Sequence, residues 1–149
     1  MVKMVYNASL ARMAQAAANT CSWKHTASAH GSGDNLFRWS QTGYAPKSTN
    51  ELIEMAILNW AGEKLHYRYR PMTESDKPFG HYTQMIWAKS TSVGCGVAKC
   101  NGRNNGSWES THHVKCWYYP QGNILTRYPY EYGRRCGSAC PAGKTCVCR

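Results

Sequence analysis

His81 is the residue of this chain whose type and setting are best suited to chemistry. It lies in the segment GHYTQMIW, which begins at Gly80 and ends at Trp87. An imidazole titrates near neutral pH, so it can act as a general acid or base or bind a divalent metal ion. The residues behind it are apolar, rich in aromatic rings and helical in pattern, a setting that is also typical of a structural core histidine. Other groups in the chain must decide between the two interpretations.

Glu63 is a second candidate, because it lies at the edge of a predicted amphipathic helix. Ser48 and Glu51 have the spacing of a capping box, which marks the start of that helix. Its predicted stripe consists of Ile53, Ile57, Trp60 and Lys64. A carboxylate at the buried edge of a helix must find a partner or shift its pKa. Glu63 is therefore either a salt-bridge residue or a site residue.

His25 is a third candidate, which an N-terminal helix would position. Small and apolar residues recur at intervals of three and four between Met1 and Cys21, and this spacing predicts an amphipathic helix. His25 follows Cys21 by four residues, about one helical turn if the helix continues. The imidazole would then lie near the apolar face.

The segments on either side of the central helix are predicted to be loops. Glycines between His30 and Tyr44 predict a loop with a short apolar insertion over Asn35–Phe37, which Asp34 precedes. A second stretch, His66–Phe79, is aromatic, basic and bounded by prolines, which predicts an exposed loop that leads to His81.

A β-hairpin is predicted around Asn105-Gly106, the strongest two-residue turn signal in the chain. With these residues in the turn, Cys95 lies opposite Cys116, which predicts a disulfide between the two strands. The same register leaves Cys100 without a partner in the hairpin. Cys21 is the one remaining cysteine outside the C-terminal group, so Cys21–Cys100 is predicted as a second bridge.

The last residues form a tail rich in glycine, serine and proline, with almost no large apolar side chain. Such a tail needs its own bridges to hold a shape. Its four cysteines, which we expect to pair among themselves, are Cys136, Cys140, Cys146 and Cys148.

The composition favours a secreted, extracellular protein. A chain of 149 residues with 42% hydrophobic content is the size of one domain with one core. Eight cysteines without the spacing of a zinc ribbon indicate an oxidising compartment. Asn7 and Asn105 lie in acceptor motifs for N-glycosylation. No apolar run is long enough for a transmembrane segment, and no signal sequence begins the chain.

The net charge of +10 favours an anionic partner such as a glycosaminoglycan, another anionic polysaccharide or acidic lipid headgroups. No basic run exceeds two residues, which is also typical of an ordinary solvated surface. Nucleic acid is not an expected partner.

Four ordered motifs, CSWKH, GHYTQMIW, GCGVAKC and VKCWYYPQGN, resemble those of the CAP superfamily. That superfamily groups cysteine-rich secretory proteins, insect antigen 5 allergens and plant pathogenesis-related class 1 proteins. The resemblance implies an α+β fold, a three-layer α-β-α sandwich, which we expect over residues 1–132. We expect the first part of the family's leading helical segment to be missing. Residues 133–149 resemble the cysteine-rich hinge of venom-allergen-like proteins that nematodes secrete.

The resemblance also implies a central cleft with two histidines and two acidic residues, which here are His25, Asp34, Glu63 and His81. Asp34 stands where the family usually has glutamate, so a ligand or water held by this shorter carboxylate would move. Trp117 stands where a small polar residue is usual.

Zinc or another divalent cation is the cofactor expected at these four residues. Two neutral imidazoles suit such an ion, but two histidines alone make an open and weak site, with an affinity that depends on pH. A metal-assisted hydrolase, in which Glu63 or Asp34 activates water, is an alternative. It lacks a clear third ligand, so a function without catalysis is favoured.

The resemblance implies a binding function, because relatives bind sterols, fatty acids or eicosanoids and several act on host receptors. The predicted lipid-binding residues occupy the place where family members take sterol, with an ordinary surface loop as the alternative. They are Tyr67, Tyr69, Pro71 and Met72. The predicted function is that of a secreted effector or allergen-like protein that binds a lipid, a sterol or a host protein receptor. A basic ligand of glycosaminoglycan or of a receptor is the other alternative.

Overall fold

A four-stranded mixed sheet with the strand order β1-β3-β4-β2 forms the centre of the fold. The computed structural model describes residues 3–41, 47–104 and 107–131. The strands are β1 (Val5–Tyr6), β2 (Gly33–Gln41), β3 (Ser92–Asn104) and β4 (Ser107–Tyr119). The α-helices are α1 (Ala8–Asn19), α2 (Thr49–Gly62) and α3 (Gly80–Met85). Short 3-10 helices are η1 (Ala27–His30), η2 (Glu63–Leu65) and η3 (Glu74–Phe79).

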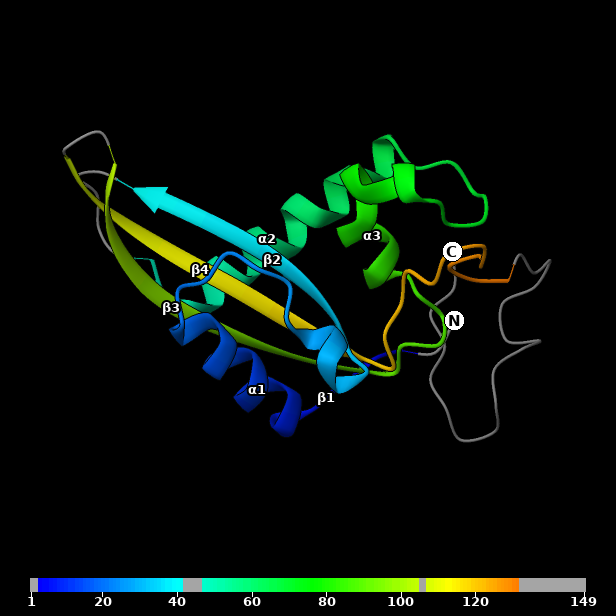
Figure 1. Cartoon of the computed structure of the whole chain (residues 1–149), viewed down its shortest axis with the longest axis horizontal. Helices are drawn as coiled ribbons and strands as arrows, with labels where there is room; N and C mark the ends of the chain where they lie inside the picture. Colours follow the sequence, from blue (N-terminus) through cyan, green and yellow to red (C-terminus); the bar gives the residue numbers. More distant parts are fainter. Residues whose placement is uncertain (1–2, 42–46, 105–106, 132–149) are drawn as a thin grey trace.

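Alternate residues of β4 contribute to two hydrophobic cores, one on each face of the sheet. The core on the α2 side contains Leu52, Ala56, Trp60, Val114, Cys116 and Tyr118. The core on the α1 side contains Leu10, Ala14, Ala27 and Trp117. Successive side chains of a strand point to opposite faces, so helices cover both sides of the sheet, as Figure 1 shows. The α+β architecture expected from the sequence is confirmed, while the predicted tail lies outside the described residues.

Two glycines of β3 allow α1 to pack directly on the sheet. A Cβ atom at Gly94 would lie 2.2 Å from the backbone nitrogen of Ala11, and one at Gly96 would lie 2.3 Å from that of Gln15. Only glycine permits this approach of backbone to backbone. The Gln15 side chain then bonds to the strand, accepting from Val97 N at 3.0 Å and donating to Val97 O at 2.7 Å.

The predicted helix from Met1 to Cys21 is wrong at both ends. Val5–Tyr6 pairs in parallel with β3, and α1 begins only after Asn7, whose side chain accepts from the first turn of the helix. The helix ends at Asn19, and Cys21 adopts a φ of 54°. The chain turns at this left-handed residue, so His25 does not lie on a continuation of the helix.

The predicted loop from His30 to Tyr44 is wrong over Gly33–Gln41, which forms β2. This strand pairs antiparallel with β4, from Gly33 opposite Tyr118 to Gln41 opposite Ser110. Pairing with a strand far along the chain supplies the backbone hydrogen bonds, and the local sequence does not reveal that pairing.

The second predicted loop, His66–Phe79, is wrong at its end, where η3 forms. Thr73 and Asp76 make a capping box at the start of this 3-10 helix. Asp76 is 1% exposed and pairs with the guanidinium of the half-buried Arg70.

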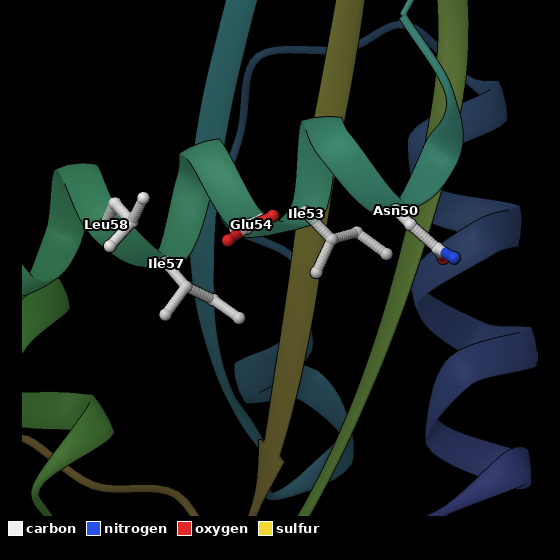
Figure 2. A pocket seen from close by; sticks show the side chains of 5 residues that line it. All are labelled: Asn50, Ile53, Glu54, Ile57 and Leu58. Carbon is white, nitrogen blue, oxygen red and sulfur yellow. The ribbon is translucent and has the colours of Figure 1, made fainter.

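Helix α2 begins as predicted, with Ser48 and Glu51 forming the capping box. Its buried face consists of Leu52, Ala56 and Trp60, so the predicted stripe is right for Trp60 and wrong for Ile57, which is 41% exposed. The face that packs on the sheet follows the i, i+4 spacing from Leu52. Figure 2 shows the pocket on this helix that Ile57 lines together with Asn50, Ile53, Glu54 and Leu58.

The β3–β4 hairpin has the predicted register, and both predicted disulfides are confirmed. Cys95 pairs with Cys116 across the strands and is bonded to it. Cys21 is bonded to Cys100, which ties the end of α1 to the sheet. Asn105 and Gly106, predicted to form the turn, and the four C-terminal cysteines lie outside the described residues.

Candidate functional site

His25 is held by Asp34 at the start of β2. The Nδ1 atom of the ring lies 2.7 Å from Asp34 Oδ1, and the backbone N–H of Thr26 donates to Asp34 Oδ2 at 3.0 Å. The Asp34 side chain is 6% exposed, whereas that of His25 is 64% exposed. A buried carboxylate therefore orients an imidazole that reaches solvent. The ring nitrogen left over for a ligand is Nε2, to which no described residue is bonded.

His81, in α3, is held in the same way by Glu63, the first residue of η2. Its Nδ1 atom lies 2.7 Å from Glu63 Oε1, and the backbone N–H of Tyr82 donates to Glu63 Oε2 at 2.9 Å. The ring stacks on Trp60 with centroids 5.8 Å apart. The sequence predicts that Glu63 is either a salt-bridge residue or a site residue. The structure places its carboxylate in a partly buried pair with His81, whose side chain is 30% exposed, so both interpretations involve the same contact.

Asn35 links strand β2, which also carries Asp34, to the backbone of His81. It follows Asp34 in β2, and its side chain donates to the backbone oxygen of His81 at 3.0 Å. Cross-strand pairing sets Asp34 beside Trp117 of the α1-side core and Asn35 beside Cys116 of the α2-side core. The two consecutive side chains thus point to opposite faces of the sheet. Asp34 bonds to the His25 ring and Asn35 to the backbone of His81, and because β2 is an edge strand of the sheet, the two histidine pairs lie on either side of that edge.

The histidine pairs do not form a crowded metal centre. Among residues 3–41, 47–104 and 107–131, no group of three or more His, Cys, Asp or Glu side chains is placed to hold an ion. The donor chemistry of the two imidazoles still fits a weak divalent site, because both rings have Nδ1 engaged by a carboxylate and Nε2 left for a ligand. In such a site Asp34 and Glu63 would orient the imidazole rings and would not be metal ligands themselves.

Electrostatics differ between the described histidines. The hydrogen bond to Asp34 raises the pKa of His25 above its ordinary value, although partial burial opposes this shift. Burial lowers the pKa of His113, which packs edge-on against Trp23, and the charges of Arg38 and Lys115 add to that decrease. His25 therefore takes up a proton more readily than His113.

Sequence reasoning missed the residues that hold the loop after β4 against α3. The Asn123 side chain donates to the backbone oxygen of Gly80 at 2.7 Å and accepts from the Thr83 hydroxyl at 2.8 Å. The amide of Gln84 accepts from Gly122 N at 2.9 Å. These residues belong to the GHYTQ and PQGN motifs, so the sequence marks them as notable. Only the three-dimensional structure shows that the two motifs are hydrogen-bonded to each other.

The predicted lipid-binding residues lie in a segment that is partly fixed by contacts with the rest of the protein. Met72 is 4% exposed and exchanges backbone hydrogen bonds with Thr126 and Arg127. The Tyr67 ring contacts Phe79 and Tyr82. Tyr69 is 39% exposed and stacks on two further tyrosines, with its hydroxyl bonded to Tyr130 O. Lipid binding by these residues remains a prediction.

The two predicted glycosylation sites differ in what the structure describes. Asn7 caps α1 through its side-chain oxygen, which leaves the nitrogen available for a glycan. Asn105 lies outside the described residues. In the described part of the chain, no helix has the length and hydropathy of a membrane span.

The helix-covered sheet, the two disulfides and the paired histidines define the class as a disulfide-bonded domain of the CAP type. The model of the cysteine-rich secretory protein family, CAP, matches residues 1–119, and the chain belongs to this family. Members of this family are typically secreted, and the two disulfides are consistent with an extracellular location.

Curated relatives include peptidase inhibitor 16 of Mus musculus, which is 33% identical over 147 residues, 98% of this chain and 28% of that protein. Venom allergen 5.02 of Dolichovespula maculata is 36% identical over 135 residues, 86% of this chain and 59% of that protein. The chain thus spans from about a quarter to three fifths of the length of these relatives.

Solved structures of related proteins share the fold. The crystal structure of Na-ASP-1 has a TM-score of 0.79 at 28% identity and covers 99% of this chain and 36% of that one. The crystal structure of NaASP2 with Zn²⁺ has a TM-score of 0.73 at 29% identity and covers 89% of this chain and 68% of that one.

Proposed function

We propose that this chain is a secreted binding protein, of the effector or allergen-like kind, in which His25 and His81 bind one divalent cation weakly. The observation that carries the proposal is the repeated arrangement of the two rings. Each Nδ1 atom meets a carboxylate at 2.7 Å, and each carboxylate is itself fixed by a backbone N–H. Such partners fix the orientation of an imidazole and raise its basicity toward a metal ion.

The same arrangement supports modest affinity. Only two protein ligands are proposed, both through Nε2, whereas structural zinc sites have four protein ligands and catalytic sites usually have three. Asp34 and Glu63 act as partners of the rings, which refines the predicted set of four metal residues into two ligands and two carboxylates that orient them. The related crystal structure of NaASP2 with Zn²⁺ is consistent with zinc as the ion.

Binding is favoured over metal-assisted hydrolysis because both carboxylates are engaged. A general base must accept a proton from water, yet Asp34 and Glu63 each already accept two hydrogen bonds. The bound cation would supply charge to hold an anionic or polar group of a partner. The chain's own residues contribute the two oriented rings.

A lipid or sterol is the second candidate ligand, and the exposed tyrosine stack favours it. Tyr69 and Tyr128 are 39% and 49% exposed, with ring centroids 4.8 Å apart. Aromatic rings of this kind offer apolar surface with a polar edge. A sterol-competition assay with Tyr69→Ala and Pro71→Ala tests this role, with Leu58→Ala as the control on another element. Unchanged sterol binding in the first two variants would remove the segment from consideration.

Isothermal titration with zinc at neutral pH tests the metal proposal. His25→Ala and His81→Ala are each expected to weaken binding about tenfold or more, because each removes one of two ligands. His66→Ala is the matched control, since His66 is an exposed histidine outside both pairs. Equal affinity in the wild-type protein and both site variants would contradict the proposal.

A further inference from the structure

Lys115 is a lysine in the interior of the sheet, beside the His25–Asp34 pair. The residue is 0% exposed and lies in β4 opposite Leu36 and Gly96. Alternation along β4 places it on the same face as Trp117, the face that α1 covers. Burial of an ammonium group is costly unless the group is paired and hydrogen-bonded. The contacts of Lys115 should therefore show what offsets that cost.

The Lys115 ammonium donates to the backbone oxygen of Lys24 at 3.1 Å. Lys24 directly precedes His25, in a segment without regular secondary structure between Cys21 and η1. Three consecutive residues of this segment are thus anchored to the sheet. Lys24 is held through its carbonyl by Lys115, while His25 and Thr26 are held by Asp34.

Asp34 supplies the negative charge that accompanies the buried ammonium. Burial lowers the pKa of Lys115, and the nearby Asp34 carboxylate opposes that decrease. The other charged or titratable groups that act on this region are His25 from the 21–26 segment, Arg38 from β2 and His113 from β4. Asp34 is the acidic member of this set, so it favours the charged lysine.

Packing alone does not account for a lysine at this position. Replacing all members of a buried ion pair with apolar groups of similar volume is often neutral or stabilising in proteins, whereas removing one member alone is destabilising. A methionine would fill the same space without the cost of desolvation. The presence of a charged lysine here is thus best explained by its hydrogen bond to the Lys24 carbonyl.

We propose that Lys115 is a positioning residue for His25, holding the Lys24 carbonyl so that the imidazole meets Asp34. The consequence for metal affinity rests on the proposed function, whereas the positioning itself does not. Loss of the ammonium leaves the Lys24–Thr26 segment attached to the sheet by Asp34 alone. The His25 ring then spends less time with Nδ1 on the carboxylate.

Nitrogen-15 NMR of the histidine rings in metal-free protein tests the positioning. In Lys115→Met, the Nδ1 and Nε2 shifts of His25 are expected to move toward those of a solvated imidazole. His81 is the control within the same spectrum, because its carboxylate partner comes from η2, and its shifts are expected to stay the same. Lys115→Met is expected to remain folded but to unfold at a lower temperature, because it removes the buried charge that accompanies Asp34. Unchanged His25 shifts in the folded variant would overturn the proposal.

Two further measurements keep the test decisive. In the wild-type protein, the Lys115 ammonium protons are expected to exchange slowly, and exchange as fast as that of surface lysines would overturn the proposal without any variant. Zinc titration of Lys115→Met is expected to show a loss of affinity of about tenfold, the usual effect of removing a partner of a metal ligand. If wild-type protein binds no zinc, the metal proposal fails while the NMR result still decides the role of Lys115.

Discussion

Removal of the Cys21–Cys100 disulfide should destabilise the protein more than removal of Cys95–Cys116. The two bridges close segments of very different length, with sequence separations of 79 and 21. Loop-closure entropy in the unfolded chain assigns about 4.5 kcal/mol to the longer loop and about 3.3 kcal/mol to the shorter one at 25 °C. The longer bridge should therefore contribute about 1.2 kcal/mol more.

Equilibrium unfolding in guanidinium chloride measures this difference. Cys21→Ala with Cys100→Ala forms one variant, and Cys95→Ala with Cys116→Ala forms the matched control. Both variants lose two sulfur atoms, but Cys95 and Cys116 belong to the α2-side core whereas Cys21 is exposed, so the control loses more packing and the predicted order requires the difference in loop length to outweigh that loss. The free energy of unfolding is expected to fall further in the first variant. An equal loss, or a larger loss in the control, would refute the reasoning from loop length.

Two further predictions concern the packing of α1 and the charge of His25. Gly96→Ala should cost about 2 kcal/mol or more in unfolding free energy, because its Cβ would meet the backbone of α1. Gly62→Ala, whose Cβ meets nothing within 4 Å, should cost nothing in the same denaturation experiment, and equal losses would contradict the close approach. Asp34→Asn should lower the pKa of His25 in an NMR titration, because the hydrogen bond that raises it loses its charge. A pKa of His25 that is raised in the folded state adds stability that is fully present below pH 6.5 and is lost as pH rises through the folded-state pKa. The free energy of unfolding of the wild-type protein should therefore exceed that of Asp34→Asn by more at pH 5.5 than at pH 8.5. An unchanged His25 pKa would show that Asp34 does not set it.

The sequence predicts best the features that depend on local chemistry or on counting. A predicted turn at Asn105-Gly106 determines which strand residues face each other, and this register places Cys95 opposite Cys116, as observed. The Ser48 capping box marks the start of α2 because both partners lie within one turn. In both cases the relevant partners are close in sequence or related by a fixed register.

Features that depend on distant partners could not be predicted in the same way. The glycines near β2 predict a loop, whereas the hydrogen bonds that make it a strand come from β4. Resemblance to a family identified His25, Asp34, Glu63 and His81 as a set, yet their division into two pairs required the three-dimensional structure. Lys115 gave no signal, because only the fold brings its ammonium to the Lys24 carbonyl.

In the proposed site, one cation contacts both oriented histidines. The most direct measurement follows the ring nitrogens of His25 and His81 by NMR during a zinc titration at pH 7.5. The Nε2 signals of both rings are expected to shift along one common binding curve that saturates at one equivalent, while the signals of His66 stay unchanged. Two independent curves, or a response at only one of the two rings, would contradict the proposal.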